Sequence, residues 1–205
     1  MKVIKRRNRA MTMERILRAM GEVIAERGTE KAGINAVAEK AQVNKVLIYR
    51  YFGGWNGLLE AYVQRGFFLS MFNDKFVEAV PDKVPLSDAS RVWTQHLVDL
   101  FREFRERKAS QDLVRWEMLN GETELARRIS TFRDESYQKL ISKINPFPGE
   151  DPQAVTAIIV SGITFMTLIG NQREEMLGID LRSDAGWARV EKAMRHLLEG
   201  IDKQL

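Results

Sequence analysis

The sequence contains no cysteine and only two histidines among its 205 residues. Without cysteine there is no disulfide, thiolate metal site or cysteine nucleophile, which fits a reducing compartment. His96 and His196 are each followed three positions later by a carboxylate, and such a pair falls short of the three or four ligands that zinc takes. Phosphate-cradling and hydrolase motifs are also missing. We therefore expect no metal, no cofactor and no enzymatic activity.

Prolines are also few, and all five lie between residues 81 and 152. The segments 1–80 and 153–205 thus lack the strongest helix breaker. Apolar residues recur with helical spacing nearly throughout, without an alternating strand pattern or an internal repeat. Breaks at Gly, Pro and Asn divide the chain into about nine helices. The sequence predicts an all-α protein.

Charge is distributed unevenly along the chain. Residues 1–52 hold 12 Lys/Arg against 5 Asp/Glu, whereas residues 53–205 hold 20 against 23. The first ten residues are basic but lack the apolar run of a signal peptide, so we expect a cytoplasmic protein. A basic N-terminus on a mildly acidic body favours a polyanionic partner there, although a solvated basic tail has the same pattern.

The basic segment also has the periodicity of a helix-turn-helix. A first helix is expected over 10–27, with Gly28 as its stop, and a second over 34–41. The turn 42–44 then leads into a third helix over 45–52, for which Asn44 is a suitable N-cap. Two short helices across a tight turn form the helix-turn-helix, whose second helix enters the major groove of DNA.

Residues 28–59 resemble the DNA-binding signature of the TetR family of bacterial transcriptional regulators. The matching positions are Gly28, Val37, Ala38, Ala41, Val43, Asn44, Ile48, Tyr49, Tyr51, Phe52 and Leu58. The resemblance implies a three-helix DNA-binding domain over 1–55 and a helical ligand-binding and dimerisation domain over 56–205.

The chain departs from the family pattern at several positions. Gly33 replaces the usual threonine, Gln42 stands where a glycine is expected, and Trp55 replaces a common lysine. A non-glycine residue at 42 is expected to accept a left-handed conformation, at a cost of about 1 kcal/mol. Val46 and Leu47 replace small or polar residues of the recognition helix. They either contact thymine methyl groups or pack within the protein.

Lys and Arg neutralise phosphates, so basic and exposed polar side chains of the motif are the DNA-binding candidates. These candidates are Arg6, Arg7, Arg9, Gly33, Asn35, Asn44, Lys45, Val46, Leu47, Tyr49, Arg50 and Tyr51. Of the aromatic residues, Tyr49 and Phe52 are expected mainly to fill the small helical core.

By resemblance, the central helices over 86–144 hold an effector pocket. Candidates are large or polar residues on apolar helices: Trp93, His96, Phe104, Trp116, Asn120, Phe165 and Met166. Such a lining favours a small apolar or aromatic effector, whereas a simple filled core would use the same residues.

Residues 153–172 carry no charge, so a membrane span is an alternative to a buried helix. Apolar residues of the last helix recur with spacing 3, 4, 3, 4, as in a coiled-coil seam, or in an amphipathic helix lying on its own core. We expect these two helices to form a homodimer through a four-helix bundle, without a membrane. The predicted interface is Val155, Ile159, Ile163, Met166, Trp187, Val190, Met194, Leu197 and Ile201.

Together these patterns predict a DNA-binding regulator, with repression favoured, that binds a palindromic double-stranded operator as a homodimer. An apolar effector would release it by favouring the non-binding state. The alternative is a helical small-molecule-binding or interaction protein whose DNA-binding head has degenerated.

Overall fold

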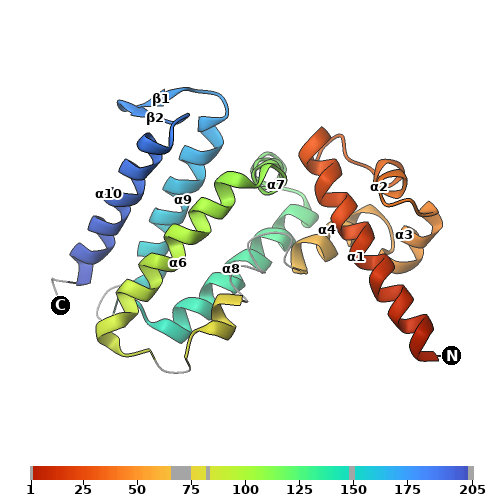
Figure 1. Ribbon diagram of the computed structural model, residues 1–205, viewed down its shortest axis with the longest axis horizontal. Coiled ribbons are helices and arrows are strands. Elements are labelled where there is room, and N and C mark those ends of the chain that lie inside the picture. The colour runs from red at the N-terminus through yellow and green to blue at the C-terminus, as the bar shows by residue number, and fades with distance from the viewer. Residues whose placement is uncertain (1, 66–74, 82–83, 148–150, 203–205) are drawn as a thin grey trace. The chain divides into compact units, whose positions relative to one another are not determined.

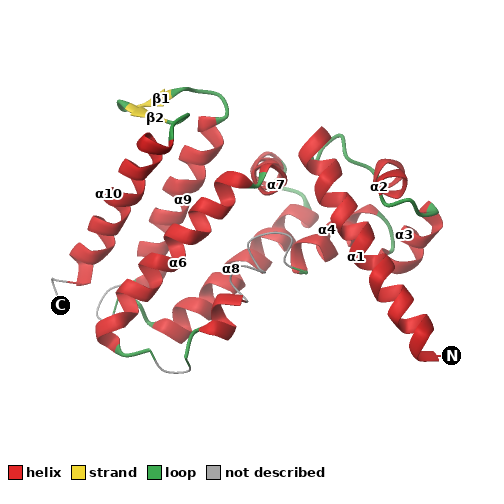
Figure 2. Ribbon diagram, in the orientation of Figure 1, coloured by secondary structure: helices red, strands yellow, loops and turns green. Residues whose placement is uncertain are grey.

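The computed structural model describes residues 2–65, 75–81, 84–147 and 151–202, and these are helical apart from one short hairpin (Figures 1 and 2). The helices are α1 (Lys2–Arg27), α2 (Ile34–Lys40), α3 (Lys45–Phe52), α4 (Trp55–Gln64), α6 (Leu86–Glu106), α7 (Lys108–Leu119), α8 (Glu124–Ile144), α9 (Pro152–Gly170) and α10 (Asp184–Asp202). The predicted all-α class is confirmed.

The hairpin pairs β1 (Glu175–Met176) with β2 (Ile179–Asp180) in antiparallel register. Its turn places Leu177 at φ +51° and Gly178 at φ +71°. Positive φ at both central positions is the turn that suits the twist of a two-residue hairpin. No strand is predicted here from the sequence, because Leu occupies a position that Asn or Asp usually takes in such a turn.

Helix α1 begins at Lys2, eight residues before the predicted start at 10. The basic N-terminal segment holds no proline or glycine and is rich in Lys and Arg, which are good helix formers. Its other end is as predicted. Gly28 has φ +80°, and its amide donates to the Ile24 carbonyl at 2.8 Å.

The chain divides into two compact units, which differ from the predicted functional domains 1–55 and 56–205. The first unit holds residues 1–72 and 107–134, and the second holds 73–106 and 135–205. Helix α1 packs against α2, α4 and α7, so α7 and the start of α8 belong with the N-terminal helices. The functional boundary near residue 55 stays a prediction.

The core of the first unit forms around the apolar face of α1. Ile16, Leu17 and Met20 are fully buried there, as are Ile48 of α3 and Leu58 of α4. Each such side chain contributes about 1.5–3 kcal/mol when it leaves water. This burial holds α3 against the helices that precede and follow it.

The link between α3 and α4 depends on glycine. Gly53 and Gly54 have φ of +76° and +123°, values that side chains rarely adopt. A Cβ on Gly57 would collide with the carbonyl oxygen of Phe52. These three glycines let α4 start close to the end of α3.

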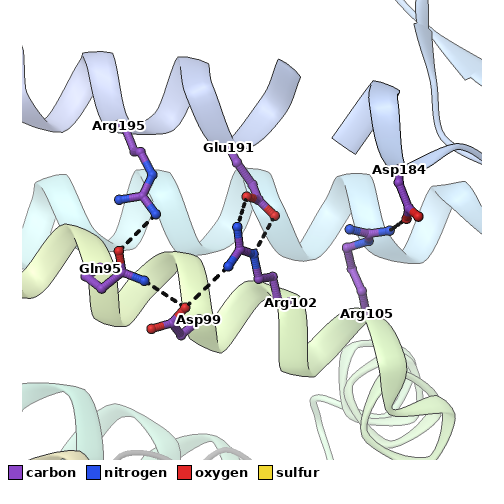
Figure 3. Close-up of polar contacts among 7 residues, drawn as sticks. All are labelled: Gln95, Asp99, Arg102, Arg105, Asp184, Glu191 and Arg195. Carbon is purple, nitrogen blue, oxygen red and sulfur yellow. Dashed lines mark hydrogen bonds and ion pairs between the residues drawn. The ribbon is translucent and has the colours of Figure 1, made fainter. Parts of the chain in front are cut away.

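The second unit centres on α6, which packs against α9 and α10. Phe101, Leu181 and Trp187 form a buried cluster, with Ile163 and Met166 packed on it. Polar contacts also join α6 and α10 (Figure 3). Arg102 of α6 donates two hydrogen bonds to Glu191 of α10, at 3.0 and 2.7 Å, and Arg195 donates to Gln95 at 3.0 Å. These contacts align α10 with α6.

Candidate nucleic-acid interface

Residues 34–52 form two short helices across a tight turn, as the sequence predicts. After α2 the chain reverses at Gln42, whose φ of +51° is the left-handed conformation expected at this position. The Val43 amide donates to the Ala38 carbonyl at 3.0 Å, which closes the turn. Asn44 then caps α3, because its side-chain oxygen accepts from the Val46 amide at 2.9 Å. Local hydrogen bonds thus fix the angle at which α3 leaves the turn.

One face of α3 is buried and the other is exposed. Ile48 is fully buried, whereas Val46 is 60% exposed and Tyr49 is 55% exposed. Lys45 and Arg50 are also exposed, and Leu47 is half-buried. The expected core role of Tyr49 is therefore wrong, because its position on α3 turns it away from Ile48. Phe52 is half-buried.

The start of α1 approaches the end of α3 through a cluster of Arg9, Tyr51 and Arg50. The guanidinium of Arg9 lies 5.2 Å from the centre of the Tyr51 ring, and that of Arg50 lies 5.0 Å from it. Arg50 also donates to the Tyr51 hydroxyl at 3.0 Å. Each cation–π contact contributes about 0.5–1 kcal/mol at an exposed site. Tyr51 thereby holds two cations from different helices in one place.

The exposed cations of this cluster differ from the paired lysine of α2. Lys40 forms ion pairs with Glu26 and with Glu22 of α1. Hydrogen bonding to Glu26 raises the pKa of Lys40, and the pKa of Glu26 is lowered in turn. Over the side chains that the structure describes, Arg9, Lys45 and Arg50 form no ion pair with a carboxylate. Their charges remain available to an external anion.

Gly33, Asn35, Arg6 and Arg7 are the remaining DNA-binding candidates, and they lie outside the turn and α3. Gly33 is the N-cap of α2 in an extended conformation and supplies no side-chain cap. Asn35 is exposed on α2. The side chains of Arg6 and Arg7 lie outside those that the structure describes.

The predicted effector residues do not form one group. Trp93, His96 and Phe104 are buried on α6 in the second unit. Trp116 and Asn120 belong to the first unit, where the Asn120 amide donates to the Trp116 carbonyl at 2.8 Å. Phe165 is 51% exposed on α9, and Met166 packs on the Phe101–Trp187 cluster.

The predicted dimer seam is divided in the same way. Trp187 and Met194 are buried within the protomer, so they are not available to a partner, and Ile163, Met166 and Val190 pack on the same cluster. Val155, Ile159 and Ile201 are half-buried. Of the predicted seam, Leu197 is well exposed, at 61%. Ile158 and Phe165 are the large exposed apolar residues of α9 that the prediction missed. The 3–4 spacing of apolar residues mainly marks the side of α10 that packs on the protomer's own core, because the most apolar side of a helix usually faces the core of its own chain.

The comparisons with known proteins agree with this geometry. Residues 16–62 match the sequence model of the bacterial regulatory proteins, tetR family. That segment contains α2, the turn, α3 and most of α1 and α4. No curated protein matches the chain.

Solved structures share the fold along most of the chain. The fatty acid degradation regulator FadR from Bacillus halodurans has a TM-score of 0.64 at 21% identity, covering 90% of this chain and 96% of its own. The transcriptional regulator FadR from Bacillus subtilis, in complex with stearoyl-CoA, has 0.65 at 18%, with the same coverage. The multidrug binding protein EbrR, complexed with imidazole, has 0.60 at 18% over 92% of this chain and 88% of its own. This chain therefore has the fold of these solved proteins, and its residues 16–62 match the sequence model of the tetR family.

Proposed function

We propose that this protein is a DNA-binding transcriptional regulator, acts as a repressor and is not an enzyme. The observation that supports this best is the outward face of α3. It carries two exposed cations and two exposed apolar side chains on a helix that its cap and core hold in place. A helix of this kind fits the major groove of double-stranded DNA.

The exposed residues divide into two roles on the duplex. Lys45, Arg50 and Arg9 neutralise phosphates, which supplies affinity and makes it depend on salt. Val46 and the Tyr49 ring contact base edges, and the methyl groups of thymine are the matching apolar groups there. We therefore expect an operator with thymine at the positions that face Val46.

A homodimer, formed through the exposed side of α9 and α10, would bind this operator. Helix α9 is long and apolar enough to cross a membrane, and only 17% of its most apolar window is buried. Ile158 and Phe165 of α9 and Leu197 of α10 lie exposed on these helices. A second copy of the chain would cover them and make the protein a soluble cytoplasmic dimer. The operator would then be a palindrome with half-sites about 34–36 Å apart, or a multiple of this distance.

We further propose that a small apolar effector binds in the second unit and releases the protein from DNA. The related folds of FadR and EbrR, solved with stearoyl-CoA and imidazole, support a ligand-responsive body. An effector of this kind acts through its differential affinity for the two states.

The test is a band shift with the DNA upstream of the protein's own gene, measured over a range of salt concentrations. Lys45→Ala and Arg50→Ala should each weaken binding on the order of 5- to 100-fold and reduce the salt slope by about one phosphate. Lys192→Ala is the matched control, since Lys192 is an exposed lysine of α10. No binding by folded wild-type protein, or equal loss in the control, would contradict the proposal and favour a degenerate head.

The dimer is tested separately by light scattering with detergent-free protein. Ile158→Glu and Leu197→Glu should each shift the dimer to monomer, because both side chains are exposed in the protomer. Recovery of the wild-type protein in the membrane fraction would contradict this interface.

A further inference from the structure

Some buried polar atoms of the second unit have no hydrogen-bond partner among the described residues. They are Trp93 Nε1 and Thr94 Oγ1 on α6, with Thr156 Oγ1 and Thr167 Oγ1 on α9. Each of these side chains is at most 5% exposed. A buried polar group that is left unpaired costs about 1–3 kcal/mol, so each calls for an explanation.

Two buried polar side chains of the first unit are paired in the part of the chain that the structure describes. Thr29 is 3% exposed, and its hydroxyl donates to Asp112 at 2.7 Å. Glu117 is 5% exposed and accepts hydrogen bonds from Ser130 and Arg133. Thr29 and Glu117 thus show that buried polar side chains of this chain can be paired within the fold.

The sharpest contrast is between two tryptophans of the second unit. The indole N–H of Trp187 donates to the Leu181 carbonyl at 3.0 Å. Trp93 is more deeply buried, at 0% exposure, and its indole N–H donates to no described atom. An indole nitrogen is a donor only, so the partner that Trp93 lacks is an acceptor.

The surroundings of Trp93 are aromatic. The His96 ring centre lies 5.6 Å from that of Trp93, and His96 stacks on Phe76 at 3.8 Å. Burial lowers the pKa of His96 to about 3, so its imidazole is neutral at physiological pH. The ammonium of Lys143 donates to the Val77 carbonyl at 2.7 Å. A trapped water needs two to four polar partners, whereas an acceptor atom on an apolar molecule needs only the indole N–H.

We propose that Trp93 donates its indole N–H to an uncharged acceptor, such as a ketone, ester or amide carbonyl, on an otherwise apolar effector. Phe76 and His96 form an aromatic wall for that ligand. This assignment rests on the proposed effector-responsive function and specifies its ligand class. Trp93, His96 and Phe76 carry no cation, and the ammonium of Lys143 is held by the Val77 carbonyl, so an uncharged acceptor is desolvated at less cost beside Trp93 than a carboxylate is.

The experiment uses the full-length protein with nitrogen-15 in its four tryptophans. Each indole N–H resonance is assigned from its own Trp→Phe variant. The probes are three matched series, each with alkyl chains of one to eight carbons: alkyl phenyl ketones, ω-phenyl carboxylates and alkylbenzenes. Binding is measured by titration of the resonances and by thermal shift.

We expect the Trp93 resonance to start at the position of a non-hydrogen-bonded indole and to move downfield with a ketone. The best ketone should bind at least tenfold more tightly than the carboxylate or alkylbenzene of equal length. Trp93→Phe should remove this preference while alkylbenzene binding remains. Trp187→Phe is the control and should keep it. Thr94→Val, a variant with little volume change, should fold even if Trp93→Phe does not, and should raise the melting temperature of the free protein.

Three results would each overturn the proposal. The first is a Trp93 N–H that is already hydrogen-bonded in the free protein. The second is a panel in which no ketone moves its resonance, or in which carboxylates bind as tightly. The third is a ketone preference that survives in folded Trp93→Phe.

Operator binding is measured on the same samples. Ketone recognition without DNA binding would refute the regulator function alone, and DNA binding without ketone recognition would refute this assignment alone.

Discussion

On α3 and at the start of α1, the basic side chains Arg9, Lys45 and Arg50 are exposed, and no carboxylate among the described residues pairs with them. On α6 the arrangement is the opposite. Arg102 is held by Glu191 and Arg105 lies 3.7 Å from Asp184, both on α10 (Figure 3). Arg105 also lies 4.5 Å from the centre of the Trp187 ring. Arg102 and Arg105 of α6 thus hold helices together, whereas we propose that Arg9, Lys45 and Arg50 bind a partner.

The largest expected effect comes from placing a negative charge on the outward face of α3. Val46→Glu should weaken operator binding by more than about 100-fold, because like charges across an interface cost several kcal/mol. The melting temperature should stay unchanged, since Val46 is 60% exposed. Met118→Glu, at a residue of α7 that is 65% exposed, is the control for added charge. Equal losses in the two variants would show that net charge alone decides binding.

His96 extends the comparison of the cations in the two regions. In the second unit it is a side chain that would become a cation below pH 6.5 if it were not buried. Burial lowers its pKa from 6.5 to about 3. Below pH 6.5 the His96 side chain therefore binds a proton in the unfolded state but not in the folded state. The free energy of unfolding accordingly falls as the pH falls from 6.5 towards 3. Between pH 7.5 and 5.5 the loss from this group is about 1.4 kcal/mol.

His96→Phe should reduce that pH dependence when urea unfolding is measured at both pH values. His196→Phe is the control, since His196 is exposed on α10. A variant at His96 with the full wild-type dependence would contradict a neutral buried imidazole.

A smaller effect is expected at the contact between α6 and α10. Glu191→Ala removes the partner of Arg102 and should destabilise the protein by about 1 kcal/mol, a value kept low because the Arg102 side chain is 55% exposed. Chemical denaturation measures this loss, with Glu199→Ala at an exposed residue of α10 as control. Operator affinity should not change in protein that remains folded and dimeric. A loss of affinity without loss of stability would place Glu191 in the regulatory machinery.

The smallest effect is expected at Lys40, a cation of the head that has partners. Its ion pairs with Glu22 and Glu26 occupy its charge, so Lys40→Ala should change operator affinity less than about twofold. The band shift that tests Lys45→Ala also measures this variant. A loss as large as that of Lys45→Ala would mean that pairing does not distinguish the cations of the head.

The helix-turn-helix was predictable because its signals are local. The Gly28 stop, the left-handed Gln42 and the Asn44 cap each depend on a few neighbouring residues, and the structure has all three. The early start of α1 is not predicted, because its basic segment has the charge pattern of a solvated tail, although no residue in it stops a helix.

The packing of the second unit depends on contacts between residues far apart in sequence, which the sequence patterns do not show. The 3–4 spacing of α10 identifies an apolar stripe but not what covers it, and Trp187 and Met194 cover the protomer's own core. The predicted effector residues share large size or polarity. These properties do not show that Trp116 and Asn120 belong to a different unit from Trp93. Only the structure shows how the two tryptophans differ. The indole N–H of Trp187 has a hydrogen-bond partner, whereas that of Trp93 has none among the described residues.

The most direct test of the central claim, that α3 reads DNA with its outward face, is site-specific cross-linking. A photo-reactive amino acid is incorporated at Val46 in one sample and at Met118 in another, two positions of similar exposure. Each protein is irradiated on operator DNA after a band shift has shown that it binds. Cross-links to bases of each half-site from position 46, and none from position 118, are the predicted result. Bound complexes that cross-link from position 118 and not from position 46 would contradict the account.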